Sequence, residues 1–274
     1  MRAEPPAPAP PSSPRARAPL AVERLGVVPY DEAARLQEHL VALRQADRIA
    51  DRLLLLEHPP VITVGVAARE SRRNILATAD ELARRGVEVR AARRGGDVTY
   101  HGPGQLVGYP VLRLAPERRD VHRYVRDLEE VLIRAAAHFG VQAGREPGLT
   151  GVWVGPDKLA AIGVRFSRWV TSHGFALNVA ADLAPFRLSR PCGIDGRGVT
   201  SLAALTGRAA SVDEVAAVVG HCFAAVFERD LQELRCNATQ ELAPQNANGV
   251  RAAVQAPGTV GAGADPEPAT GWRR

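Results

Sequence analysis

Apolar residues recur along the chain at two spacings, and each spacing predicts a different element. Apolar side chains three and four residues apart are typical of amphipathic helices. This spacing predicts helices over residues 30–51, 80–85, 120–139 and 211–233. Short apolar or β-branched runs between turn residues are typical of strands. Such runs predict strands over residues 21–28, 53–56, 61–64, 87–90, 106–112, 151–154, 159–166 and 170–179.

The order of these elements predicts the class of fold. The strands over residues 159–166 and 170–179 are joined by a tight link at Ser167 and Arg168, so we expect a hairpin. Other strands are joined through helices. Hairpins and helical connections in one chain predict an α/β or α+β domain, in which helices pack on a mixed β-sheet.

Composition suggests where this domain begins and ends. Residues 1–19 are rich in Pro, Ala, Ser and Arg, and residues 237–274 are rich in Ala, Gly, Pro, Asn and Gln. Segments of this kind bury too little apolar surface to fold, so both ends are predicted to be disordered tails. Residues 20–236 then form one domain, of a size that a single hydrophobic core supports.

Charge and cysteine content narrow the compartment and the partners. No apolar run is long enough for a membrane helix, and the first twenty residues lack a signal peptide's apolar segment. Three widely spaced cysteines do not make a disulfide framework, so a cytoplasmic location is expected. The net charge of +5 favours acidic partners, unless the arginines simply cover a solvated surface. No nucleic-acid module is recognisable, so neither nucleic acid nor membrane is a predicted partner.

A glycine-rich segment over residues 94–110 is the first candidate for a functional site. Glycine lets the backbone approach a ligand closely. Arg, Thr, Tyr, His and Gln side chains stand between these glycines. The segment is therefore predicted to form the wall of a pocket, with a glycine-rich surface turn as the alternative.

Lys158 and Cys192 are the candidate catalytic residues. Lys158 is the only lysine of the chain, and the other 34 basic residues are arginines. Lysine, unlike arginine, can lose its proton when its surroundings favour the neutral amine, although one lysine could also survive by chance. Cys192 lies between Pro191 and Gly193 in a predicted loop, where catalytic groups are often placed. From these residues alone, a nucleophile and an inert thiol remain equally open.

Three segments of the chain, in the same order, resemble the lipoyl(octanoyl) transferases. They are residues 94–109, 157–164 and 191–202, and the similarity extends over about residues 20–234. The resemblance implies the fold of the catalytic domain shared by biotin protein ligases and lipoate ligases. It also implies transfer of an octanoyl group from octanoyl-acyl carrier protein to a lysine of lipoyl domains, the first step of endogenous protein lipoylation. The implied acceptors are the lipoyl domains of 2-oxoacid dehydrogenases and the glycine cleavage H protein.

The same resemblance implies the roles of individual residues. Cys192 would be the nucleophile that carries the acyl group as a thioester, and Lys158 would lower its pKa and act as general base. No cofactor is implied, and no Cys/His cluster has metal-ligand spacing, so no metal site is predicted. His58 and His173 stay open between structural and site roles. The implied substrate-binding residues are Arg94, Gly95, Gly96, Asp97, Val98, Thr99, Tyr100, His101, Ala161, Ile162, Gly163, Gly174, Phe175 and Ala176.

Two other functions are weighed against this one. An ATP-dependent lipoate or biotin ligase on the same fold would also use a glycine-rich segment and a lysine, but it would need no cysteine nucleophile. A non-catalytic binding module would not need a reactive thiol at all. The sequence Pro191-Cys192-Gly193 favours the transferase, and a requirement for ATP would favour the ligase.

Overall fold

The computed structural model describes residues 17–68, 74–190, 197–208 and 210–234, all within one compact unit, Met1–Ala238. Eight of its strands form one mixed sheet in the order β11-β1-β2-β6-β10-β9-β8-β7. The β11–β1 and β1–β2 pairs are parallel and the others are antiparallel. In that order the strands are β11 (Arg229–Leu234), β1 (Ala18–Val27), β2 (Asp51–Glu57), β6 (Gln105–Val111), β10 (Val170–Asn178), β9 (Asp157–Ser167), β8 (Leu149–Val154) and β7 (Gly144–Glu146).

A second, three-stranded sheet carries the glycine-rich segment. Its order is β4-β3-β5, with β3 (Val61–Val64) parallel to β4 (Glu88–Ala91) and antiparallel to β5 (Val98–His101). The short helix α2 (Ala79–Arg84) precedes β4, and the Thr78 hydroxyl caps it by accepting from the Glu81 amide. The pairing of β3 with β5 fixes the position of the glycine-rich segment relative to the rest of the chain.

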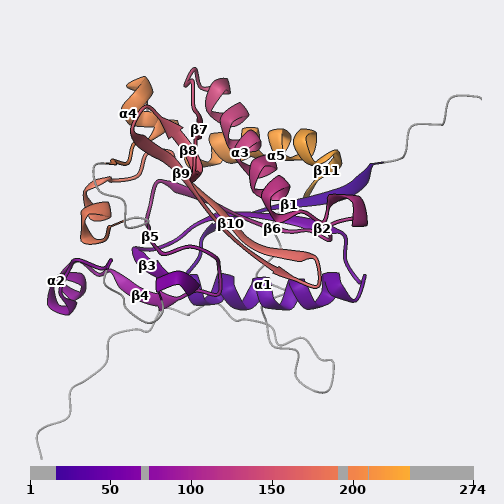
Figure 1. Cartoon of the computed structure of the whole chain (residues 1–274), viewed down its shortest axis with the longest axis horizontal. Helices are drawn as coiled ribbons and strands as arrows, with labels where there is room; N and C mark the ends of the chain where they lie inside the picture. The colour runs from indigo at the N-terminus through magenta and orange to yellow at the C-terminus, as the bar shows by residue number, and fades with distance from the viewer. Residues whose placement is uncertain (1–16, 69–73, 191–196, 209, 235–274) are drawn as a thin grey trace, which may run out of the picture. The chain divides into compact units, whose positions relative to one another are not determined.

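Helices cover both faces of the large sheet (Figure 1). The helix α1 (Tyr30–Gln45) packs on one face, and α3 (Val121–His138) and α5 (Val212–Phe227) pack together on the other. Side chains of Asp120 and Ser211 cap α3 and α5 by accepting from first-turn amides. Shorter elements are α4 (Leu202–Thr206), η1 (Val66–Ala68), η2 (Pro116–Arg118) and η3 (Ala184–Leu188). Among the described residues, no helix is long and apolar enough to cross a membrane.

This architecture confirms the predicted fold class, an α+β domain with helices on a mixed sheet. The β9–β10 hairpin, α3 and the short helix α2 are present as predicted. β1 begins at Ala18, inside the predicted N-terminal tail. Residues 1–16, and the whole of the predicted tail over residues 237–274, lie outside the described residues.

Two predicted helices end earlier than their apolar spacing indicated. α1 ends at Gln45, and the left-handed backbone of Asp47 (φ +54°) directs the chain into β2, which pairs with β1. α5 ends at Phe227, and Glu228 (φ +54°) leads into β11. The helix predictions over residues 46–51 and 228–233 are therefore wrong. The chain turns after each helix, and pairing with β1 stabilises strand from Asp51 and from Arg229 onward, which local spacing does not reveal. The strands β5, β7 and β11 and the helix α4 were not predicted.

Asp51 joins the elements at one end of the large sheet. Its buried carboxylate accepts hydrogen bonds from Arg44 Nε (2.8 Å), the Arg113 amide (3.0 Å) and Arg229 Nε (3.0 Å). These donors come from α1, the segment after β6, and β11. One side chain thus satisfies donors from three segments that are far apart in the sequence.

We expect Asp51→Ala to lower the free energy of unfolding by about 3 kcal/mol, because two largely buried guanidinium groups lose their common acceptor. Asp230→Ala is the matched control, since Asp230 is exposed and lies on β11 beside Arg229. It should change stability by no more than about 0.5 kcal/mol. Urea denaturation of both variants measures the difference. Equal, small effects would show that Asp51 does not hold these segments together.

Candidate active site

The glycine-rich segment lies directly against the middle of β9. The Gly95 amide donates to the Val164 carbonyl (3.0 Å), and the Gly65 amide donates to the Asp97 carbonyl (3.0 Å). A Cβ atom on Gly163 would come within 2.9 Å of Arg94 Cδ and 3.0 Å of the Gly95 carbonyl oxygen. Glycine at residue 163 therefore permits the close approach of strand and loop, as its place in the predicted pocket suggested.

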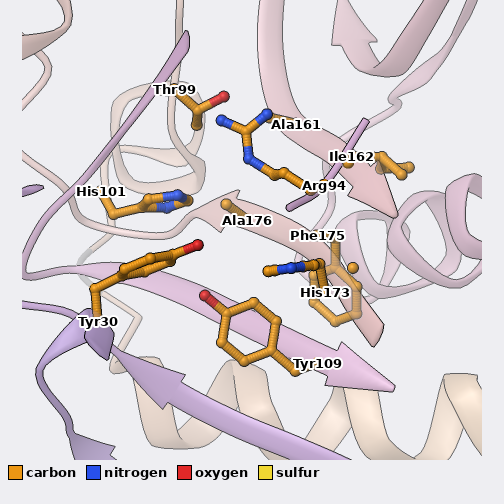
Figure 2. A pocket seen from close by; sticks show the side chains of 12 residues that line it. Tyr30, Arg94, Thr99, His101, Tyr109, Ala161, Ile162, His173, Phe175 and Ala176 are labelled. Carbon is orange, nitrogen blue, oxygen red and sulfur yellow. The ribbon is translucent and has the colours of Figure 1, made fainter. Parts of the chain in front are cut away.

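A narrow pocket of about 30 Å³ lies between this segment and the β9–β10 hairpin. Figure 2 shows ten of its lining side chains, which converge from α1, the glycine-rich segment, β6, β9 and β10. Nine of the fourteen predicted substrate-binding residues line it. They are Arg94, Thr99, His101, Ala161, Ile162, Gly163, Gly174, Phe175 and Ala176. Tyr30, Tyr109 and His173 complete the lining and were not among the predicted residues.

Five predicted residues do not line the pocket but hold the segment in place. The Asp97 carboxylate accepts from the Val98 amide (2.8 Å) and from the side chain of Asn74. Tyr100 packs edge-on against Phe186, with ring centroids 5.2 Å apart, and Val98 is buried in the same apolar cluster. Gly95 lies against β9, and Gly96 adopts φ +86°, which favours glycine.

Arg94 is a buried cation in the pocket wall. Its Nη2 donates to the carbonyl (3.0 Å) and hydroxyl (2.8 Å) oxygens of Thr63, and its Nη1 donates to the Gly95 carbonyl (3.1 Å). Only 8% of the residue is exposed. These bonds fix the guanidinium between β3 and the glycine-rich loop.

His101 begins a chain of buried hydrogen bonds that reaches the strand of Lys158. Burial, His58 and Arg94 lower the pKa of His101 to about 3, so the ring is neutral at physiological pH. Its Nδ1 lies 2.7 Å from Gln105 Oε1, while Gln105 Nε2 donates to Asn178 Oδ1 (2.9 Å). Because Gln105 Oε1 can only accept, His101 carries its proton on Nδ1. Its Nε2 carries no proton and faces the Thr63 hydroxyl at 3.3 Å.

A second buried histidine orders the aromatic side of the pocket. His58 Nδ1 lies 2.6 Å from the Val28 carbonyl, so this nitrogen must carry the proton. Its Nε2 then accepts from the Tyr109 hydroxyl (2.7 Å), and burial lowers the pKa of His58. The Tyr30 ring stands edge-on to His58 with centroids 5.5 Å apart. His58, which the sequence left open, thus orients a pocket tyrosine.

His173 has an uncommon backbone for a strand residue. Its φ of +54° lies in the left-handed region, which non-glycine residues rarely adopt, and its amide donates to Gln37 Oε1 (2.7 Å). The ring packs against Tyr109 at 6.1 Å. Burial, Arg94 and Arg165 lower the pKa of His173 to about 4. His173 is therefore a neutral member of the pocket.

Lys158 is buried at the start of β9, beside a β-bulge in its pairing with β8. Its Nζ lies 4.7 Å from the centre of the Trp153 ring, which also contacts Arg197. The Lys158 amide donates to the Gly198 carbonyl (3.0 Å), and its carbonyl accepts from the Thr200 amide (3.0 Å). Lys158 does not line the pocket but precedes Ala161 by three residues on the same strand.

Cys192 lies outside the described residues, which resume at Arg197. The chain before it is held by the Arg190 amide, which donates to the Asn74 carbonyl (2.7 Å). The chain after it is held by an Arg197–Glu146 ion pair (2.6 Å) and by the Gly198 bond to Lys158. Cys222 lies half-buried in α5 against the core, and burial raises the pKa of its thiol. In the described ranges, no three His, Cys, Asp or Glu side chains are grouped to hold a metal.

We expect the buried neutral histidines to destabilise the fold in acid. His101 has a pKa of about 3 in the folded state against an ordinary 6.5, so between these values only the unfolded chain binds its proton. The free energy of unfolding then falls by about 1.4 kcal/mol per pH unit for this group as pH drops below 6.5. His101→Gln should reduce the slope of stability against pH by about that amount between pH 4.5 and 6.

The exposed His39 supplies the control for this titration, because it lies on the solvent side of α1. His39→Gln should leave the slope unchanged. Urea midpoints at a series of pH values give both slopes, whatever the substitution does to absolute stability. Identical slopes for the two variants would contradict a neutral, buried His101.

Comparison with known proteins places this chain in a family. Residues 29–224 match the lipoyl protein ligase A/B catalytic domain. An octanoyltransferase from Solibacter usitatus is 52% identical over 210 residues, which cover 77% of this chain and 94% of that protein. An octanoyltransferase from Rubrobacter xylanophilus is 56% identical over 194 residues, which cover 70% of this chain and 86% of that protein.

Solved structures agree on the fold. Lipoate-protein ligase A bound with ATP superposes with a TM-score of 0.60 at 16% identity, covering 83% of this chain and 92% of that one. A bi-partite lipoate protein ligase from Thermoplasma acidophilum superposes with a TM-score of 0.59 at 16% identity, covering 84% of this chain and 91% of that one. These likenesses confirm the predicted lipoate-ligase fold. Sequence identity to the two octanoyltransferases is above one half over most of the domain. The chain therefore belongs to the octanoyltransferases, which are acyltransferases of the lipoyl protein ligase A/B catalytic domain family.

Proposed function

We propose that this enzyme transfers an octanoyl group from octanoyl-acyl carrier protein to a lysine of lipoyl domains through a thioester on Cys192. Its acceptors would be the lipoyl domains of 2-oxoacid dehydrogenases and the glycine cleavage H protein. The observation that carries the proposal is the position of Lys158. Lys158, the only lysine of the chain, is buried, and its backbone is hydrogen-bonded to Gly198 and Thr200. These two residues follow shortly after Cys192 in the sequence.

In the first half-reaction, the Cys192 thiolate attacks the carbonyl carbon of the octanoyl thioester. A new bond forms between sulfur and carbon, and the bond to the carrier's sulfur breaks. That sulfur takes a proton from the Lys158 ammonium and leaves as a thiol, so Lys158 becomes neutral. The ammonium of Lys158 stabilises the attacking thiolate. The net charge of +5 suits an acidic carrier protein as donor.

In the second half-reaction, the amine of the acceptor lysine attacks the Cys192 thioester. The amide bond forms, the bond to Cys192 sulfur breaks, and the amine loses a proton. Lys158, once neutral, accepts that proton as general base. An arginine would stay charged and could not do this, which is consistent with one lysine in a chain whose other basic residues are arginines.

The pocket between the glycine-rich segment and the β9–β10 hairpin is the proposed acyl pocket. Ala161, Gly163, Gly174 and Ala176 present small side chains or none, which suits an unbranched chain. At about 30 Å³ the pocket is narrow, as an unbranched chain requires. His101 and His173 are neutral, so Arg94 is the one charged side chain among the residues that line this pocket.

Mass spectrometry of the intact protein tests the acyl-enzyme directly. After mixing with octanoyl-acyl carrier protein in the absence of ATP, the mass should rise by one octanoyl group. The adduct should disappear in Cys192→Ser and persist in Cys222→Ser, because Cys222 lies half-buried in α5 with its thiol pKa raised. Adding a lipoyl domain should then return the enzyme to its free mass.

A different result would favour the ATP-dependent ligase, whose fold is shared. In that case no adduct would form, and a lipoyl domain would be modified only from free octanoate and ATP. An adduct that persisted in Cys192→Ser would instead place the nucleophile elsewhere in the chain.

A further inference from the structure

A second pocket lies next to the acyl pocket, on the side of α1. It is much the larger, at about 340 Å³, and its walls come from α1, residues 91 and 93, and the part of the hairpin nearest its turn. Tyr30 and His173 line both pockets, and no other described residue does. These two side chains therefore stand between the two cavities.

The strand β9 gives the order of these cavities relative to Lys158. Lys158 lies near its start, Ala161 to Gly163 line the acyl pocket, and Arg165 and Ser167 line the second pocket. At about 3.3 Å per residue, Gly163 is about 16 Å along the strand from Lys158. An acyl chain whose carbonyl is held at the Lys158 end would thus point its tail toward Tyr30 and His173.

Both residues are held firmly in this position. Tyr30 is the first residue of α1, is 5% exposed and stands edge-on to His58. His173 keeps its left-handed backbone through the bond from its amide to Gln37 Oε1. In Figure 2 the side chains of Tyr30, Tyr109 and His173 point toward one another at this end of the pocket. An unfavourable backbone conformation that the surroundings maintain is often associated with function.

The second pocket has a mixed lining that includes several polar side chains. Gln37 lines this cavity and is 2% exposed, and its Nε2 has no hydrogen-bond partner among the described residues. Arg165, Ser167 and Ser172 contribute further polar groups. A hydrocarbon tail that reached this cavity would cover polar groups without bonding to them, which costs free energy.

We propose that Tyr30 and His173 form the end wall of the acyl pocket and set the longest acyl chain that the enzyme transfers. This inference rests on the proposed octanoyl transfer and adds a determinant of its chain-length specificity. Shortening either side chain would join the two cavities and make room for additional methylene groups.

The test compares initial rates of transfer to a lipoyl domain from acyl carrier protein loaded with chains of 8 and 12 carbons. Tyr30→Ala and His173→Gly each remove one half of the wall. Glycine suits the backbone of residue 173 and keeps its amide bond to Gln37. Each variant should raise the ratio of the 12-carbon to the 8-carbon rate by about tenfold or more, a size typical of opening a pocket to extra methylenes.

Two further variants distinguish loss of the end wall from a general loosening of the pocket. Tyr30→Phe keeps the ring and should keep the wild-type ratio. Ala34→Phe fills the second pocket from α1, which Ala34 lines without touching the acyl pocket. Alone it should leave the octanoyl rate unchanged, and added to Tyr30→Ala it should return the ratio toward wild type.

The inference fails if Tyr30→Ala and His173→Gly, shown to be folded by thermal melting, keep the wild-type ratio or have no measurable 12-carbon rate. If one variant does not fold, the other decides. A wild-type enzyme that transfers no octanoyl group from the carrier protein would refute the proposed function instead, so the two failures are distinguishable.

Discussion

Two main-chain hydrogen bonds hold Lys158 against Gly198 and Thr200, and the arrangement of the site depends on them. The Thr200 carbonyl also accepts from Asn178, which bonds to Gln105, which in turn accepts from His101. This buried network joins the strand of Lys158 to the glycine-rich segment through the middle of the large sheet. Fully paired polar networks in a low-dielectric interior are rigid, since an unpaired member would be costly. The lysine and the pocket are thereby held in one geometry.

Burial keeps the histidines of the pocket neutral and assigns their protons. The accepting partners of His58 and His101 place the proton of each ring on Nδ1, so each ring leaves Nε2 as an acceptor. The buried cation next to them, Arg94, is fixed by the carbonyl groups of Thr63 and Gly95. Proton transfer in the proposed mechanism thus depends on Lys158, while the histidines shape and order the pocket.

The sequence predicted much of this arrangement, for physical reasons that also explain what it missed. The apolar spacing in α3 and the apolar runs of the hairpin are visible in the local sequence. The glycines and polar side chains of residues 94–110 likewise indicated a pocket. Tyr30 and Tyr109 looked like the start of a helix and a strand residue, because only the packing of α1 beside β6 brings them together. The backbone of His173 depends on Gln37, which is 136 residues away. β11 is stabilised by pairing with β1, which is distant in the sequence. The local spacing of apolar residues therefore predicted that the preceding helix would continue through it.

The proposed mechanism depends on activation of the Cys192 thiol by the ammonium of Lys158. The rate at which iodoacetamide alkylates Cys192, followed by peptide mass spectrometry across a range of pH, gives the apparent pKa of that thiol. We expect a pKa below the value of about 8.5 that a free thiol has, and a clear rise of this pKa in Lys158→Met, which keeps an unbranched side chain over Trp153. The same pKa in both proteins would contradict it.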